Sequence, residues 1–278
     1  LRLFMKKICA QNGASLGDYI LSSYGTPRIV YLRDIDFEHT EYLLRCVPED
    51  ESFTKMFSLF GIVSLPVLIE YPAGYRILSG FRRLHAARTL KYSHLPAIII
   101  PHDAVDDKSF FISAILANYG QTVSDLAAAR ILRKAAHVFD FSMDETTGVI
   151  APLLSLPSSE AVVRQYMAVG GLPASVQHSM LQGKISLKGA RILTRLSPAE
   201  LEVLQETLFK KCVLSASDIT NMYEYMQILL HRDNISWRAA LLSDSITAIL
   251  DNAKLSKKQK GERCLLTLRQ KAYPFMTR

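Results

Sequence analysis

The amino-acid pattern changes once along this chain, near Asp106, and that change constrains the fold more than any other feature. Before it, short apolar runs rich in β-branched residues alternate with segments of helical spacing. After it, helical spacing continues to the C-terminus. Strands must lie beside other strands to form a sheet, so only the first part of the chain can supply one. The sequence therefore predicts an α+β fold, with a small α+β N-terminal domain followed by all-α regions.

The first part contains strand and helix signals in a definite order. Strands are predicted at Arg28–Leu32, Leu65–Tyr71, Tyr75–Ser79 and Ala97–Pro101, and helices at Asp50–Phe60 and Phe81–Leu90. The turn Pro72-Ala73-Gly74 joins the second and third strands as a hairpin. Gly61 suits the end of the first helix. The predicted order is β-α-β-β-α-β.

Well-marked helix starts characterise the second part. Ser142-x-x-Glu145 and Ser197-Pro198-Ala199-Glu200 are capping boxes, and Thr122-x-x-Asp125 is close to one. Helices are predicted at 107–118, 123–138, 143–154, 159–169, 174–182, 187–196, 198–211, 216–231, 236–252 and 256–272. With a boundary near Gly120-Gln121, we predict three domains, at residues 1–120, 121–200 and 201–278.

One candidate binding site lies where a predicted strand ends and a helix begins. Gly80 permits a tight backbone turn, and the helix start that follows presents N–H groups and a positive dipole end. Arg82 and Arg83 add two guanidinium groups in the first helical turn, which suit phosphate or carboxylate. We predict an anion cradle here; the alternative is a solvated helix face.

The segment 142–169 has the dimensions of a helix-turn-helix, with a short Leu156-Pro157-Ser158 turn between its helices. We expect Val162, Tyr166 and Val169 to pack inward. The residues left to face outward, and so to contact DNA, are Ser158, Ser159, Glu160, Arg164 and Gln165. Gln and Arg can bind adenine and guanine edges with two hydrogen bonds. An ordinary helical hairpin in a bundle is the alternative.

The positive charge of the chain is concentrated at its C-terminal end. The net charge is +7, and residues 254–278 contain eight Lys and Arg against the single Glu262. Lys257, Lys258 and Lys260 belong to this segment, which can neutralise DNA phosphates and release counterions. The alternative is a solvated helix end that aids solubility.

Several other classes of protein are disfavoured by the sequence. The cysteines Cys9, Cys46, Cys212 and Cys264 form no Cys-x-x-Cys pair, so we predict scattered reduced thiols in a cytoplasmic protein. No apolar stretch approaches the roughly 20 residues of a membrane span, and Leu1–Ala10 lacks the apolar run of a secretory signal. Because the chain opens with Leu1 instead of Met, we expect its natural start to differ from residue 1.

Taken together, the motifs over about residues 27–200 resemble those of the ParB/RepB family of partition proteins. In order along the chain they are Gly61-Ile62-Val63-Ser64-Leu65-Pro66-Val67-Leu68-Ile69, Gly80-Phe81-Arg82-Arg83-Leu84-His85-Ala86-Ala87, Ala117-Asn118, the helix-turn-helix, Leu172-Pro173-Ala174-Ser175-Val176 and Gly183-Lys184-Ile185-Ser186-Leu187-Lys188-Gly189-Ala190-Arg191. Their order and spacing are more specific than any one of them.

The resemblance implies a protein that binds double-stranded DNA, commonly as a homodimer, in plasmid or chromosome partition or in transcriptional regulation. It implies an N-terminal domain similar to the sulfiredoxin fold that holds CTP with magnesium, and a cytoplasmic location on the nucleoid or plasmid. Carried over by position, Gly80, Arg82 and Arg83 cradle the nucleotide phosphates, and Asn118 helps to hold the metal.

Two departures from the family pattern bear on catalysis. Phe81 stands where the signature has Glu, and Ala117 stands where the family's Glu-Asn pair has its acidic residue. Loss of both carboxylates argues against nucleotide hydrolysis, which needs them to manage metal and water. Two alternatives stay open: a nucleotide-dependent phosphotransferase or hydrolase of the ParB fold, and a non-catalytic adaptor whose helices in 201–278 bind a partner protein.

Overall fold

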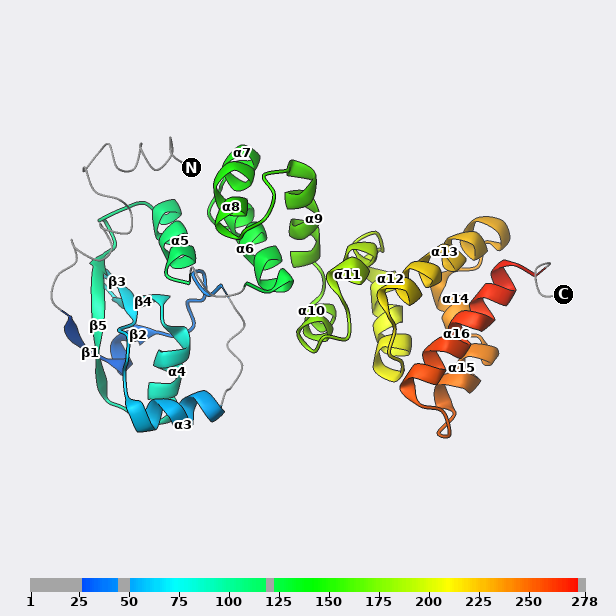
Figure 1. The fold of residues 1–278 in the computed structure, drawn as a ribbon, viewed down its shortest axis with the longest axis horizontal. Coiled ribbons are helices and arrows are strands. Elements are labelled where there is room, and N and C mark those ends of the chain that lie inside the picture. Colours follow the sequence, from blue (N-terminus) through cyan, green and yellow to red (C-terminus); the bar gives the residue numbers. More distant parts are fainter. Residues whose placement is uncertain (1–26, 45–50, 119–122, 275–278) are drawn as a thin grey trace. The chain divides into compact units, whose positions relative to one another are not determined.

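The computed structural model describes residues 27–44, 51–118 and 123–274. The chain divides into two compact units, Leu1–Arg164 and Gln165–Arg278 (Figure 1). Three features of the sequence lie outside the described residues: the segment Leu1–Ala10, the boundary Gly120-Gln121 and the helix start at Thr122.

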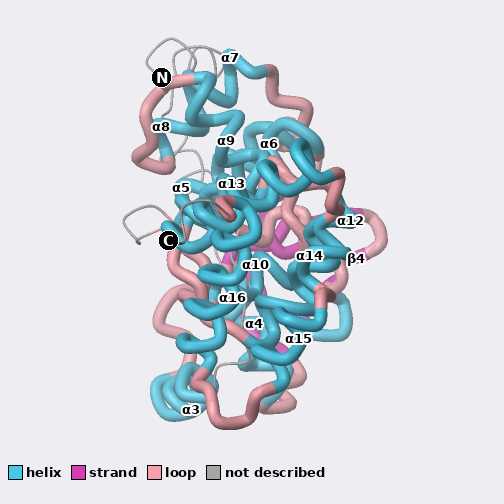
Figure 2. The backbone as a smooth tube through the Cα atoms, turned by 90° about the vertical axis from the view of Figure 1, so that its right-hand side faces the viewer, coloured by secondary structure: helices cyan, strands magenta, loops and turns pink. Residues whose placement is uncertain are grey.

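The first unit contains a five-stranded mixed sheet, which confirms the predicted α+β class. The strands lie in the order β1 (Arg28–Tyr31), β5 (His94–Pro101), β3 (Val67–Tyr71), β4 (Gly74–Ser79) and β2 (Ile35–Asp36). The β3–β4 hairpin is antiparallel, whereas β3 and β5 run parallel. The short strand β2, which the sequence pattern did not predict, pairs with β4. In Figure 2 the strands (magenta) lie together and helices (cyan) make up most of the chain.

The helices of the first unit fall close to their predicted ranges. They are α3 (Glu51–Phe60), α4 (Phe81–Thr89), α5 (Asp107–Leu116), α6 (Asp125–His137), α7 (Met143–Glu145), the π-helical turn η2 (Thr146–Ile150) and α8 (Ala151–Leu153), with a 3-10 turn η1 (Leu32–Asp34) between β1 and β2. Ser142 and Glu145 form the predicted capping box. The cap of α6 is Ser124, because its hydroxyl accepts the Ala127 N–H.

An aromatic cluster joins the sheet region of the first unit to its later helices. The Phe111 ring stacks on Phe139 with centroids 4.3 Å apart, and Phe141 lies 6.1 Å from Phe111. Tyr42 contacts the Phe139 ring at 5.4 Å. Large buried rings supply much of the apolar burial that holds a core together. Strands and helices α5 to α8 thus share one unit, and the three-domain division at 120 and 200 stays a prediction.

The second unit is helical over the residues that the structure describes. Its elements are α10 (Ala174–Leu181), α11 (Leu187–Leu193), α12 (Pro198–Leu204), η3 (Gln205–Phe209), α13 (Ala216–Asp233), α14 (Trp237–Leu241), α15 (Asp244–Asp251) and α16 (Lys257–Ala272), and α9 (Glu160–Gly170) contains the division between the units. The single helix predicted at 236–252 is wrong. It breaks at Leu242, because Ser243 adopts extended backbone and stands at the N-cap position of α15.

The packing of α13 against α16 forms the centre of this unit. Met222, Met226 and Leu229 on α13 are almost completely buried, as are Cys264 and Leu268 on α16. Their spacing of three to four residues is the apolar stripe that a core-facing helix requires. Over the described ranges, no helix is both long enough and apolar enough to span a bilayer.

Candidate functional site

The turn at Gly80 has a backbone conformation that only glycine accommodates. Its φ is +94°, and a Cβ atom there would lie 2.8 Å from Pro66 Cβ. The Gly80 carbonyl accepts the backbone N–H groups of Arg83 and Leu84, which starts α4 directly after β4. Glycine is required both for the left-handed backbone and for the close approach of Pro66. The predicted strand–turn–helix at this position is confirmed.

Arg83 is fastened to the segment that leads into β3. Its Nη1 donates to the Ser64 hydroxyl at 2.6 Å, to the Leu65 carbonyl at 3.0 Å and to the Ser64 carbonyl. Burial lowers the pKa of the half-buried Arg83 guanidinium. The side chain therefore stabilises the turn as well as placing a positive charge beside it.

Arg82 takes a different direction from Arg83. It is exposed, and its guanidinium lies 4.3 Å from the centroid of the Phe53 ring on α3. A cation over an aromatic face is attracted by the ring quadrupole. The structure thus brings Gly80 and Arg83 together with Ser64, and directs Arg82 along the neighbouring face of α4 toward α3.

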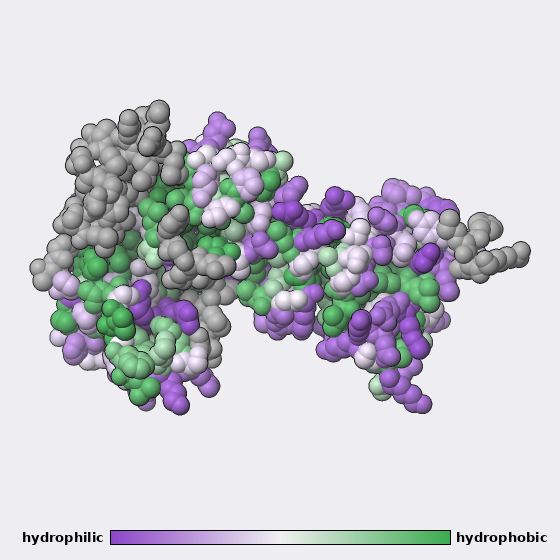
Figure 3. Space-filling view, in the orientation of Figure 1, coloured by the Kyte–Doolittle hydropathy of each residue, from purple (hydrophilic) through white to green (hydrophobic). Residues whose placement is uncertain are grey.

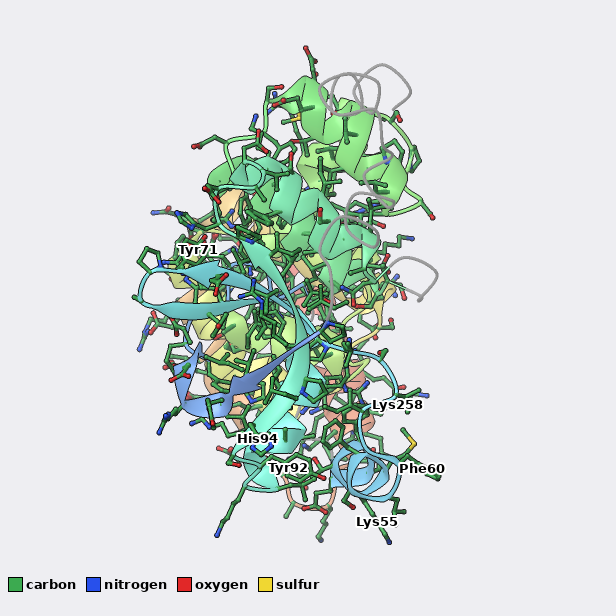
Figure 4. The ribbon with its side chains drawn as sticks, turned by 90° about the vertical axis from the view of Figure 1, so that its left-hand side faces the viewer. Lys55, Phe60, Tyr71, Tyr92, His94 and Lys258 are labelled. Carbon is green, nitrogen blue, oxygen red and sulfur yellow. The ribbon has the colours of Figure 1, made fainter. Side chains whose placement is uncertain are left out.

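The apolar face of α3 is more exposed than its sequence suggests. Of the four residues that share this face, Phe57 is buried and Phe53 half-buried, while Met56 and Phe60 are 53% and 73% exposed. Figure 3 shows apolar atoms (green) where α3 lies, and Figure 4 labels Phe60 there with Tyr92 nearby. The Phe57 and Tyr92 ring centroids are 6.0 Å apart.

The residues expected to manage a metal lie at the end of α5 and at the start of α4. Asn118 follows α5, and its side-chain amide donates to the Ala114 carbonyl at 2.8 Å. Phe81 is buried, and Ala117 is exposed. Among the described residues, no three His, Cys, Asp or Glu side chains gather in a way that could hold a metal ion. The start of α4 and the guanidinium groups of Arg82 and Arg83 suit an anion.

The second candidate surface is the polar face of α9. Val163, Tyr166 and Val169 are buried. The prediction that Val162 packs inward is wrong by one residue, because Val162 is half-buried and Val163 takes the inward position. The residues expected to contact DNA lie on the other side: Ser158, Glu160, Arg164 and Gln165 are exposed, and Ser159 is half-buried. Burial thus divides α9 into an apolar face and a polar face.

Within the polar face of α9, Arg164 already has a partner. Its Nη2 lies 2.5 Å, and its Nε 2.7 Å, from Glu160 Oε1, one helical turn away. Both side chains are well exposed, so this ion pair contributes only a few tenths of a kcal/mol, on the order of 0.3–0.5. A phosphate or a base edge can therefore replace Glu160 at small cost.

The helix that precedes α9 is held at its start and disturbed in its middle. Lys108 Nζ donates to Glu145 at 2.8 Å, which links α5 to the capping box of α7. Burial raises the pKa of Glu145, but the hydrogen bonds from Lys108 and Ser142 outweigh it and hold the pKa below its usual value. Pro152 lacks an N–H to continue the helical ladder, and the preceding turn η2 widens to π geometry.

The lysines at the start of α16 fall into two groups. Lys257 and Lys258 are exposed, in a region where Figure 3 shows hydrophilic atoms (purple) and Figure 4 labels Lys258. Lys260 is half-buried, and its Nζ donates to the Leu250 carbonyl at the end of α15, at 2.7 Å. Only the first two lysines point toward solvent in this structure.

One half-buried cation, Lys134, was not predicted from the sequence. Lys134 Nζ on α6 donates to the backbone carbonyls of Thr40, Glu41 and Leu43, at 2.7, 2.9 and 3.0 Å. Burial lowers its pKa to about 8. No local pattern could have indicated this role, because Lys134 and Thr40 are 94 positions apart in the sequence.

Several curated proteins are similar to this chain in sequence. The nucleoid occlusion protein of Lysinibacillus sphaericus is 24% identical over 185 residues, which covers 65% of this chain and 57% of that protein. The nucleoid occlusion protein of Bacillus pumilus is 27% identical, over 54% of this chain and 50% of that protein. The probable chromosome-partitioning protein ParB of Chlamydia trachomatis is 23% identical, over 57% of this chain and 56% of that protein. The chain spans about half the length of these relatives.

Solved structures give weaker matches, and no family model matches the chain. The C-terminally truncated ParB from Caulobacter crescentus complexed to the centromeric parS site has a TM-score of 0.37 at 18% identity, over 64% of this chain and 91% of that one. The same protein complexed with CTP-gamma-S has a TM-score of 0.31 at 18% identity, over 62% and 94%. A Pnob8-like ParB-N domain has a TM-score of 0.39 at 14% identity, over 89% and 97%.

Proposed function

We propose that this chain, which is related in sequence to the ParB family, binds double-stranded DNA through α9 and the turn before it. The observation that carries the proposal is the division of α9 by burial, with Val163, Tyr166 and Val169 inside and Glu160, Arg164 and Gln165 outside. A capped helix, a short turn and a second helix with such a face have the dimensions that fit a DNA major groove.

The polar face of α9 contains side chains suited to base edges and to phosphates. Gln165 can bind adenine and Arg164 guanine with two hydrogen bonds each. The hydroxyls of Ser158 and Ser159 stand at the start of the helix, where backbone N–H groups favour a phosphate oxygen. Glu160 leaves Arg164 when DNA arrives, because carboxylate and phosphate compete for the same guanidinium.

Lys257 and Lys258 would add affinity that does not depend on sequence. They are exposed, and each phosphate that a lysine neutralises releases condensed counterions. Lys260 contributes less, because its ammonium group is bonded to the Leu250 carbonyl. Sequence preference is therefore assigned to α9 and general affinity to the start of α16.

The same proposal extends to assembly and role. A helix-turn-helix commonly reads two half-sites as a dimer, so we assign a homodimer on a two-fold symmetric DNA site. The relatives are named for nucleoid occlusion and chromosome partitioning. We assign this chain to DNA partition or transcriptional regulation in the cytoplasm, on the nucleoid or on a plasmid.

The Gly80 turn is proposed to hold the phosphates of a nucleotide, with CTP as the first candidate. Gly80 and Arg83 form a rigid turn, and Arg82 adds an exposed guanidinium at the same helix start. These groups bind and orient phosphate oxygens. We propose no step through Mg²⁺ and no hydrolysis, because positions 81 and 117 lack the carboxylates that such a step requires.

The test is the selection of bound sequences from random duplex DNA, with and without CTP. Wild type is expected to enrich one motif, and the double variant Arg164→Ala/Gln165→Ala to lose preference at about two positions, each by roughly 1–3 kcal/mol. Arg238→Ala, an exposed arginine on α14, is the matched control and keeps the motif. Equal enrichment by wild type and by the double variant would remove α9 from the interface.

A separate measurement addresses the nucleotide. Calorimetry with CTP and with ATP is expected to show CTP binding that Arg82→Ala weakens, since Arg82 is the more exposed of the two guanidinium groups. The two parts of the proposal are tested separately. If CTP binds and no DNA sequence is selected, only the nucleotide site is supported. If a DNA sequence is selected and CTP does not bind, only the DNA-binding surface is supported.

A further inference from the structure

Two cysteines that are distant in the sequence lie against each other in the second unit. Cys212 is in the short segment between η3 and α13, and Cys264 is on the buried face of α16. The Val213 N–H donates to the Lys257 carbonyl at 3.2 Å, which fixes this segment along α16. Both are free cysteines, while Cys9 and Cys46 lie outside the described residues.

A glycine on α16 makes the close approach of the two cysteines feasible. A Cβ atom on Gly261 would lie 2.9 Å from the Val213 carbonyl oxygen and 3.7 Å from Cys212 Cβ. Gly261 and Cys264 are one helical turn apart and share the buried face of α16. The segment with Cys212 therefore rests directly on the helix surface beside Cys264.

The two thiols differ in how readily they lose a proton. The neighbouring Cys264 side chain, with help from Lys260 and Lys211, lowers the pKa of Cys212 despite its burial. The neighbouring Cys212 side chain and burial raise the pKa of Cys264. Cys212 is therefore the sulfur that carries negative charge first, and the thiolate is the reactive form of cysteine.

Access from solvent favours Cys212 as well. Cys212 itself is 6% exposed and Cys264 only 1%. The neighbours of Cys212 reach the surface, however: Val213 is 45% exposed and Lys211 is partly exposed. A small oxidant thus meets Cys212 just beneath the surface, while Cys264 stays behind it.

We propose that Cys212 and Cys264 are a redox pair that closes to a disulfide when the chain meets hydrogen peroxide. The proposal is independent of the assigned DNA binding. The pair links the segment after η3 to α16, and so clamps the last described helix of the chain to the remainder of its unit.

The chemistry proceeds in two steps. The Cys212 thiolate attacks one peroxide oxygen, the O–O bond breaks, and the departing hydroxide takes a proton to become water, which leaves Cys212 as a sulfenic acid. Cys264 sulfur then attacks Cys212 sulfur, the S–O bond breaks, and the hydroxide that leaves takes the Cys264 proton. Two thiols lose two electrons in total, and one peroxide is reduced to two waters. A dithiol reductant reverses the reaction by exchange.

The experiment uses the full chain, treated with hydrogen peroxide near neutral pH, alkylated, and digested without reduction. Mass spectrometry is expected to find a peptide that joins Cys212 to Cys264 and that disappears after dithiothreitol. Thermal unfolding of the oxidised chain is expected to shift upward by about 5 °C or more, because the crosslink closes a long loop in the unfolded state.

Two variants and a control complete the test. Cys264→Ser is expected to trap the Cys212 sulfenic acid, which dimedone labels, and Cys212→Ser to abolish the crosslinked peptide. The double variant Cys9→Ser/Cys46→Ser is the matched control and keeps the peptide. Two results with the wild-type chain would overturn the proposal. One is that both Cys212 and Cys264 are alkylated after peroxide treatment. The other is a crosslink that joins either of them to Cys9 or Cys46.

Discussion

Arg83 and Lys134 in the first unit differ in their surroundings from Lys257 and Lys258 in the second. In the first unit, Arg83 and Lys134 donate hydrogen bonds to backbone carbonyls and are partly buried. At the start of α16 in the second unit, Lys257 and Lys258 are exposed. Each of these side chains carries one positive charge, so the difference lies in what surrounds the charge.

Charge alone therefore does not identify a binding surface. A cation bonded to carbonyls stabilises the fold, and its removal leaves those carbonyls without a donor. An exposed lysine loses little when it is removed, so its substitution changes binding and leaves stability nearly unaltered.

The strongest test is substitution of the glycine that positions Arg83. Gly80→Ala is expected to lower the free energy of unfolding by ~2–4 kcal/mol, because it combines a left-handed backbone with a Cβ 2.8 Å from Pro66 Cβ. Urea denaturation measures the loss. Gly148→Ala is the control: its Cβ would meet nothing within 4 Å, and its stability is expected to stay level or rise by up to ~1 kcal/mol.

The neighbouring arginines of α4 offer a paired test. Arg83→Ala removes the donor to Ser64 and Leu65 and is expected to cost ~2 kcal/mol of stability. Arg82→Ala loses an exposed contact with Phe53 and is expected to cost under ~1 kcal/mol. Urea denaturation measures the free energy of unfolding of both variants. Equal decreases would show that Arg83 does not stabilise the fold more than Arg82 does.

Lys134 adds a pH dependence to the comparison. Burial lowers its folded-state pKa to about 8, so above that pH the folded chain releases this proton while the unfolded chain keeps it. The unfolded state then binds more protons, and stability due to Lys134 increases with pH between about 8 and its unfolded value near 10.5.

The variant Lys134→Met isolates this contribution. It is expected to be ~1–2 kcal/mol less stable than wild type at pH 7, because three carbonyls each lose a hydrogen bond. The gap between the two proteins is expected to widen as pH is raised from 8 to 10. A gap that stays constant over that range would show that the Lys134 pKa is not lowered.

The smallest effect is expected at the surface lysines. Lys257→Ala/Lys258→Ala is expected to leave stability within ~0.5 kcal/mol of wild type and to reduce the salt dependence of DNA binding by up to about 0.9 per lost phosphate contact. Fluorescence anisotropy at several salt concentrations measures the slope. Lys260→Ala is the matched control. It is expected to lower stability, because the Leu250 carbonyl loses the hydrogen bond from Lys260, and to leave the salt dependence of DNA binding nearly unchanged.

Local chemistry allowed much of the fold to be predicted. Capping boxes at Ser142 and Ser197, the hairpin turn before Gly74 and the break at Gly80 depend on residues within a few positions of each other. The missed break at Leu242 and the one-residue error at Val162 depend on packing and not on neighbouring residues. An apolar segment can form a helix that buries one or another of its side chains, and only packing selects which one is buried.

The sequence by itself determined where the helices with capping boxes at Ser142 and Ser197 begin, that residue 80 must be glycine, and which residues could carry charge to a phosphate. Only the tertiary structure decided which charges remain available for that purpose. Lys134 and Lys257 have the same side chain, yet one meets three carbonyls from a segment 94 positions away and the other meets solvent. The free energy of a charge depends on the groups that the fold places around it, and these come from distant parts of the chain.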